Sequence, residues 1–248
     1  DTAVKWPEFR HSLFSFASRL IVGWRRRRVF RRRWRRWRRG WLVMNQTIYR
    51  RRPASSLPTV IFSLLVANGV IYALQQLKPE FMFINFALWP ATDPRSPFAL
   101  WQLLTYGFLH GSPMHIFFNM FALWMFGRDL ENHMGSQRFL VYFLVCVVGA
   151  GFIQLLVAAM QGGLYPTVGA SGGVFGILLA YGLTFPIRIV VPLFPPIPMR
   201  AITFVFLFGL LELYLGVSGG APGVANFAHL GGMLFGFLML RYLRKQRR

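Results

Sequence analysis

Acidic residues are scarce in this chain of 248 residues, which has 7 Asp and Glu against 28 Lys and Arg and a net charge of +21. Cysteine is almost absent: Cys146 is the only one, so no internal disulfide can form. The five histidines form no H-E-x-x-H motif and no other ligand cluster with the single cysteine. We therefore expect no disulfide framework, no metal and no cofactor.

Apolar residues dominate what remains. The hydrophobic content is 55% and the mean hydropathy is +0.45. Several stretches approach the roughly 20 uncharged residues that a helix needs to cross a bilayer. The composition excludes an ordinary soluble domain and predicts an integral membrane protein.

Six apolar ranges have the length and pattern of membrane spans. They are residues 58–77, 113–127, 138–160, 167–185, 201–217 and 224–241. The sequence therefore predicts an all-α, polytopic membrane protein with six transmembrane helices.

The positive charges between the spans set the orientation of these helices. The second and fourth connections and the C-terminal tail, 242–248, are basic, whereas the third and fifth connections contain no Lys or Arg. Only Lys78 and Arg95, in the long first connection, depart from this pattern. Both termini are therefore expected in the cytoplasm, with residues 53–241 forming the membrane domain.

The N-terminal segment, residues 1–52, holds seventeen of the 28 basic residues and reads as a disordered basic leader. One interpretation is a cytoplasmic arm that binds anionic lipid or RNA. The other is that residues 1–43 lie outside the native reading frame, because the first methionine is Met44. We favour the second interpretation and expect no nucleic-acid partner.

A few polar residues interrupt the spans, and such residues inside a membrane usually have a function. They are His115, Asn119, Ser171, Glu212, Asn226 and His229. The second, fourth and sixth spans all run from the outer face inwards, and each has its polar groups in its first turns. His115, Ser171 and His229 are therefore expected at one depth, in the outer third of the bilayer.

Glycines at helical spacing predict which of these spans touch. Small residues four positions apart let helix backbones approach closely in lipid. The expected packing glycines are Gly169, Gly172, Gly173 and Gly176 in the fourth span and Gly232 and Gly236 in the sixth. Such an approach would bring Ser171 within about 2.6–3.2 Å of His229, the distance at which a base activates a nucleophile.

These residues predict a serine hydrolase site. Histidine would remove the hydroxyl proton, and His115, the Asn119 amide and the Ser171 N–H would stabilise the oxyanion. No acid is placed like the Asp of a triad, so we expect a Ser–His dyad. Glu212 stays open between a carboxyl bonded to a neighbouring helix or snorkelling outwards and a role near the dyad or the substrate entrance.

The motifs resemble those of the rhomboid intramembrane serine proteases, in their six-span bacterial form. The similar stretches are "GASG" at 169–172, "AHLGGMLFG" at 228–236, "HIFFN" at 115–119 and "GRDLENHMGSQRF" at 127–139. The resemblance implies Ser171 as nucleophile, His229 as base and His115 and Asn119 as oxyanion donors. It also implies a structural turn at Glu131, Gly135 and Arg138.

Two positions depart from the family pattern. Trp101 is followed by Gln102 where many members have Arg, and Phe175 stands where a Tyr often packs on the histidine. We expect the Phe175 ring to stack on the base equally well, without the hydroxyl.

The resemblance implies cleavage of other proteins' transmembrane segments near the outer face of a bacterial cell membrane. The partners would be transmembrane substrates and the lipid bilayer; the oligomeric state stays open. An inactive relative that binds membrane helices is the main alternative. A transporter or channel would instead place its polar residues at the bilayer midplane.

Overall fold

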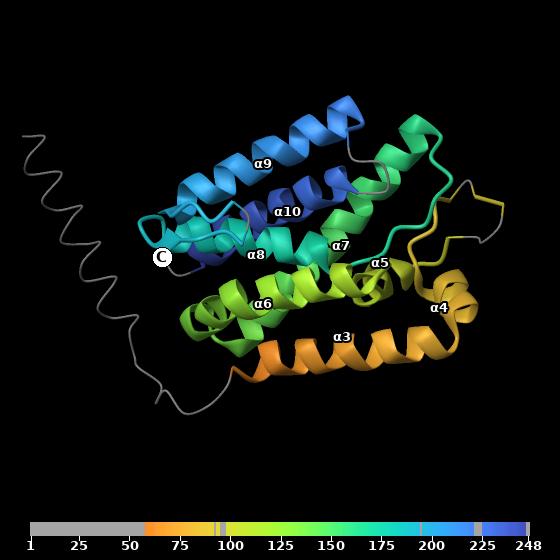
Figure 1. The fold of residues 1–248 in the computed structure, drawn as a ribbon, viewed down its shortest axis with the longest axis horizontal. Helices are drawn as coiled ribbons and strands as arrows, with labels where there is room; N and C mark the ends of the chain where they lie inside the picture. The colour runs from red at the N-terminus through yellow and green to blue at the C-terminus, as the bar shows by residue number, and fades with distance from the viewer. Residues whose placement is uncertain (1–57, 92, 95–97, 194, 221–224, 247–248) are drawn as a thin grey trace, which may run out of the picture. The chain divides into compact units, whose positions relative to one another are not determined.

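The computed structural model describes residues 58–91, 93–94, 98–193, 195–220 and 225–246 (Figure 1). The basic leader expected over residues 1–52 lies outside this part. The long helices are α3 (Thr59–Leu77), α6 (Pro113–Met134), α7 (Ser136–Gln161), α8 (Ser171–Thr184), α9 (Ala201–Ser218) and α10 (Asn226–Lys245). Each of them occupies one of the ranges expected to span the membrane.

Within the described residues, α3, α7 and α9 are long and apolar enough to cross a bilayer, and α8 is a shorter apolar helix. Their outward faces are apolar as well. On α9, for example, Phe206, Leu210, Leu213 and Tyr214 are all exposed. Large exposed apolar faces on several helices are what a protein surrounded by lipid requires, so the prediction of a largely helical membrane protein is confirmed.

Shorter elements lie in the connections. The first connection contains α4 (Pro79–Phe86), α5 (Gln102–Thr105) and the 3₁₀ turn η1 (Tyr106–Phe108). An isolated bridge between Leu88 and Thr167 fixes this connection to the segment before α8. The sequence analysis had no expectation for these elements, which are too short to leave a clear periodic pattern in the sequence.

One short element besides the helices was not expected from the sequence. β1 (Ile189–Val190) pairs antiparallel with β2 (Met199–Arg200) in the connection before α9. Beside this ribbon, Arg188 forms an ion pair with Asp129 on α6 and lies over the Phe185 ring.

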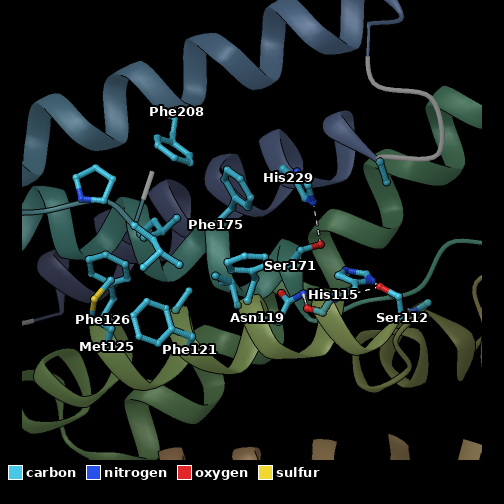
Figure 2. A pocket seen from close by; sticks show the side chains of 18 of the residues that line it. Ser112, His115, Asn119, Phe121, Met125, Phe126, Ser171, Phe175, Phe208 and His229 are labelled. Carbon is cyan, nitrogen blue, oxygen red and sulfur yellow. Dashed lines mark hydrogen bonds between the residues drawn. The ribbon is translucent and has the colours of Figure 1, made fainter. Parts of the chain in front are cut away.

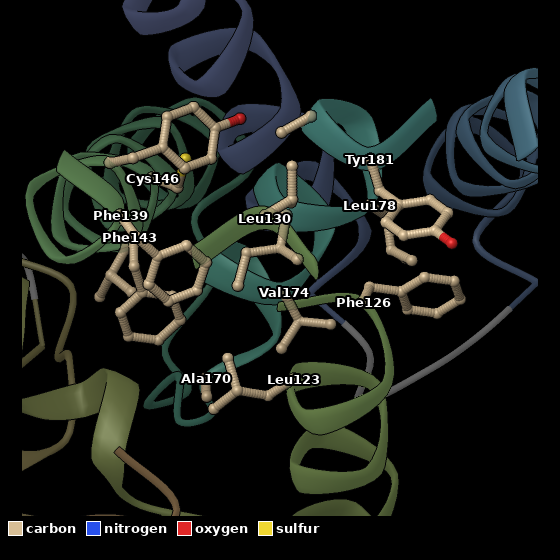
Figure 3. Packing of buried hydrophobic residues seen from close by; sticks show 14 of the residues in the cluster. Leu123, Phe126, Leu130, Phe139, Phe143, Cys146, Ala170, Val174, Leu178 and Tyr181 are labelled. Carbon is tan, nitrogen blue, oxygen red and sulfur yellow. The ribbon is translucent and has the colours of Figure 1, made fainter. Parts of the chain in front are cut away.

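The centre of the bundle is formed by α6, α7, α8 and α10 (Figure 1). Aromatic and aliphatic side chains fill the space between these helices (Figure 3). They include Leu123, Phe126 and Leu130 from α6, Phe139 and Phe143 from α7, and Val174, Leu178 and Tyr181 from α8.

Glycines allow α8 and α10 to meet backbone to backbone. A Cβ on Gly232 would overlap the carbonyl oxygen of Gly172 and lie 2.7 Å from its carbonyl carbon. Gly236 approaches Gly176 less closely: an added Cβ would lie 3.3 Å from the Cα of Gly176 but would overlap the Tyr142 hydroxyl of α7. Gly173 is different, because it faces Phe143 of α7 rather than α10.

A buried carboxylate connects the N-terminal end of α3 to the C-terminal end of α6. Glu131, near the C-terminus of α6, accepts hydrogen bonds from the N–H groups of Val60 at 3.1 Å and Ile61 at 2.8 Å. These are among the first N–H groups of α3, which have no partner within that helix. The Ser136 hydroxyl donates to the same carboxylate at 2.6 Å, and Gly135 makes the turn between them with a φ of 86°.

Candidate active site

Ser171 is the first residue of α8, and the turn before it depends on Gly169. Gly169 has a φ of 128°, a conformation that a side chain strongly disfavours. A Cβ there would also lie 2.7 Å from Cε1 of His115. The sequence analysis expected Gly169 to pack between helices, and this expectation is wrong. Gly169 instead gives the backbone its turn beside His115 and Ser171.

The Ser171 hydroxyl contacts the second histidine of the predicted pair. Ser171 Oγ and His229 Nε2 are 2.8 Å apart (Figure 2). His229 lies in the first turn of α10 and is 9% exposed. The Phe175 ring is stacked on the imidazole with a centroid distance of 4.3 Å and an interplanar angle of 8°, so the apolar ring fixes the plane of the histidine.

The other nitrogen of His229 meets Glu212, the acid whose role the sequence left open. Glu212 Oε2, on α9, is 2.8 Å from His229 Nδ1. The expectation that no carboxylate stands in the position of a triad acid is therefore wrong. The sequence indicated an acid in this span, but not which side of the helix faces α10.

His115 lies in the first turn of α6, and Ser112 caps the start of this helix. The Ser112 hydroxyl accepts the N–H of His115 at 3.1 Å, and Pro113 occupies the first helical position. The Gly111 N–H donates to Nδ1 of His115 at 3.3 Å. In the neutral ring the proton is then on Nε2, the nitrogen that would lie 2.8 Å from a Cβ on Gly169.

Asn119 is buried one turn further along α6. Its amide nitrogen donates one hydrogen bond to the carbonyl of His115, at 2.9 Å. Because a side-chain amide nitrogen carries two hydrogens, one remains available for another acceptor.

These side chains lie at one end of a cavity of about 790 Å³. The polar side chains at this end include Ser112, His115, Asn119, Ser171 and His229, as Figure 2 shows. The other end is apolar and lies between α6 and α9, lined by Phe121, Met125, Phe126 and Phe208. The cavity thus combines a cluster of polar groups with an apolar extension, as binding sites commonly do.

The first connection supports the site from one side. The Gly169 N–H donates to the carbonyl of Tyr106 at 2.9 Å, and the Tyr106 hydroxyl donates to the carbonyl of Val147 at 2.7 Å. Gln102 is buried, and its oxygen accepts from the N–H groups of Trp89 and Ala99. The side-chain amide of Gln102 thus holds this loop through backbone N–H groups.

His110 is a buried residue of this connection that sequence reasoning missed. Gln75, on α3, binds both its backbone groups, donating to the carbonyl at 2.6 Å and accepting the N–H at 3.0 Å. The His110 ring stands edge-on to His115 with a centroid distance of 5.2 Å. Burial and the neighbouring His115 lower the pKa of His110 to about 4, so the ring is neutral near pH 7.

Comparison with known proteins identifies the family of this chain. The family model described as "Rhomboid domain" matches residues 97–246, which include Ser171 and His229. The chain belongs to the rhomboid family. It is accordingly a multi-pass membrane protein, as that domain implies.

Individual rhomboid relatives are similar over much of the chain. "Rhomboid protease GlpG" of Photorhabdus laumondii is 31% identical over 181 residues, covering 71% of this chain and 58% of that protein. "RHOMBOID-like protein 4" of Arabidopsis thaliana is 34% identical over 139 residues, covering 56% of this chain and 33% of that protein. "Rhomboid protease GlpG" of Yersinia pestis is 28% identical over 180 residues, covering 71% of this chain and 60% of that protein. The aligned region thus spans less than two thirds of each of these relatives.

Proposed function

We propose that this rhomboid is an intramembrane serine endopeptidase that cleaves transmembrane segments of other membrane proteins. The observation that carries the proposal is the 2.8 Å contact between Ser171 Oγ and His229 Nε2 at the polar end of a cavity. Two relatives are named rhomboid proteases, which supports the same reaction.

The chemistry is acyl transfer to Ser171. His229 Nε2 takes the hydroxyl proton while Oγ attacks the scissile carbonyl carbon, and it later gives that proton to the leaving amine. The resulting acyl-enzyme is hydrolysed by water, which His229 activates in the same way. No cofactor takes part in these steps.

Three side-chain and backbone groups are suited to stabilise the oxyanion. The first N–H groups of a helix lack intrahelical partners and carry partial positive charge, and Ser171 begins α8. Nε2–H of His115 and the second amide hydrogen of Asn119 are the further donors. Such groups act most strongly when they are already oriented before charge develops.

The apolar part of the cavity indicates the substrate class. A carbonyl in a regular helix is bonded and shielded, so only a locally unwound segment can present it to Ser171. Apolar side chains of that segment would enter the space between α6 and α9, beside Phe121 and Phe208. α9 then forms the lateral gate through which the substrate enters.

The membrane arrangement is part of the proposal. Six helices span the bilayer, both termini are cytoplasmic, and the site lies near the outer face, because α6, α8 and α10 all start there. The membrane is the cytoplasmic membrane of a bacterial cell.

The test is cleavage of a model transmembrane substrate by the purified full chain. Ser171→Ala and His229→Ala should each reduce cleavage to background, and Asn119→Ala should reduce it by about 10²-fold because the other donors remain. Ser63→Ala is the matched control, since Ser63 on α3 only donates to the carbonyl of Thr59. Wild-type cleavage in the Ser171→Ala protein would contradict the mechanism.

A serine-directed fluorophosphonate probe separates the protease from an inactive relative that only binds membrane helices. The protease predicts that the probe labels the wild-type and Ser63→Ala proteins and spares Ser171→Ala. A folded wild-type protein that neither reacts with the probe nor cleaves the substrate would favour the binding function.

A further inference from the structure

Glu212 is an acid on a membrane-spanning helix that the mechanism above does not use. It is 8% exposed, although a carboxylate in this environment is costly. Its Oε2 is 2.8 Å from His229 Nδ1 and receives a second hydrogen bond from the amide of Asn226, at 2.7 Å. Two neighbouring polar groups from α10 thus converge on one oxygen from α9.

We propose that Glu212 completes a Ser171–His229–Glu212 triad as the residue that positions the base. This inference rests on the proposed function, since it assigns a role to Glu212 in the same reaction. It replaces the dyad that the sequence led us to expect.

The hydrogen-bond directions support this role. For Nε2 of His229 to accept the Ser171 proton, the ring hydrogen must be on Nδ1. The group facing Nδ1 must then be an acceptor, and an ionised carboxylate is an acceptor only. Asn226 can only donate through its amide nitrogen, so Oε2 accepts in both contacts and the correct histidine tautomer is fixed.

The charge of Glu212 matters in the next step. When Ser171 Oγ bonds to the carbonyl carbon, its proton moves to Nε2 and His229 becomes an imidazolium. The adjacent carboxylate stabilises that cation without taking its proton. When Nε2 gives the proton to the leaving amine, the neutral histidine and the ionised Glu212 are restored.

A purely structural role for the same contact makes different predictions. Glu212 also joins α9 to α10, so it could act as a latch that keeps the gate closed. Loss of a latch would free α9 and raise substrate access, with a change in KM. Loss of a positioning residue would lower kcat and leave KM unchanged.

The experiment compares Glu212→Gln with Glu131→Gln in the purified full chain. Gln keeps the size and an acceptor oxygen of Glu but removes its charge. Glu131 is the matched control, because it is also buried but binds the start of α3 and Ser136. We expect Glu212→Gln to lower kcat by about 10²- to 10⁴-fold, with KM within twofold.

The control should separate catalysis from folding. Glu131→Gln should lower the melting temperature and leave kcat of the folded protein within twofold of wild type. Glu212→Asp keeps the charge on a shorter side chain and should recover part of the kcat lost in Glu212→Gln. Unchanged or increased kcat in Glu212→Gln would overturn the proposal, the increase being the result a gate latch predicts.

The role of Glu212 can also be tested by NMR spectroscopy, which does not require the purified protein to cleave a substrate. In the wild-type protein, ¹⁵N-labelled histidine should show a His229 Nδ1 proton shifted downfield by its bond to the carboxylate, and Glu212→Gln should reduce that shift. If wild type and Ser171→Ala both fail to cleave, the proposed function fails. The absence of the shifted Nδ1 proton in wild type would in addition overturn the assignment of Glu212, and its presence would sustain it.

Discussion

His110 shows how a single buried residue makes the fold sensitive to pH. The folded pKa is about 4, against an ordinary value of 6.5, because burial and the nearby His115 disfavour the charged ring. Between these two values the unfolded chain binds more protons than the folded chain. The contribution of His110 to the free energy of unfolding is therefore fully present above about pH 6.5 and is lost as the pH drops towards 4, by about 3 kcal/mol in total.

The corresponding prediction concerns the melting temperature of the full chain in detergent between pH 7 and pH 4. The wild-type value should fall across this window, and His110→Phe, which keeps a ring but cannot titrate, should show a flatter profile. The comparison uses the slope, so a change in absolute stability from the substitution does not affect it. Equal slopes in the two proteins would show that another group controls the acid response.

Some contacts of the site could be predicted from the sequence and others could not. The Ser171–His229 distance of 2.8 Å matches the contact that the glycine pattern predicted, because helix periodicity fixes which residues share a face. The place of Glu212 was left open, and Gly169 was wrongly expected to pack between helices. The rotation of α9 about its axis and the start of α8 are set by tertiary packing, which one sequence does not encode in a simple period.

At the scale of elements, the close contact of α8 and α10 determines the site. In lipid no hydrophobic effect drives helices together, so van der Waals packing of small residues and interhelical hydrogen bonds hold them. Gly232 and Gly172 meet through backbone atoms, which cannot move aside like a flexible side chain. The spacing of these two helices therefore sets the distance between nucleophile and base.

Gly232→Ala should consequently separate α8 from α10. A misplacement of about 1 Å in a catalytic contact lowers the rate by about 10²-fold, and overpacking destabilises by about 1–3 kcal/mol. Gly69→Ala on α3 is the matched control, because an added Cβ meets nothing within 4 Å and alanine is the better helix former. Cleavage and melting temperature are the measurements, and full activity in Gly232→Ala would contradict this dependence on helix spacing.

For the whole molecule, the apolar ranges predicted the long helices because span length follows directly from bilayer thickness. The sequence did not predict α5, η1 or the β1–β2 ribbon. Elements of two to four residues are too short to leave a periodic pattern, and tertiary contacts such as the Leu88–Thr167 bridge stabilise them. The first connection nevertheless supports Gly169, whose N–H donates to the carbonyl of Tyr106 in η1.

The proposed topology can be tested because the native cysteine gives no background. Cys146 is fully buried, so an impermeant maleimide should label only introduced cysteines. Gln161→Cys and Ser218→Cys, at the exposed ends of α7 and α9, should react in intact spheroplasts. Gln137→Cys and Gln246→Cys should react only after permeabilisation, since the basic connections and tail are retained in the cytoplasm. Labelling of Gln137→Cys from outside would show that the orientation of the bundle is the reverse of the one proposed. Ser171 would then lie near the cytoplasmic face, and substrates would be cut there.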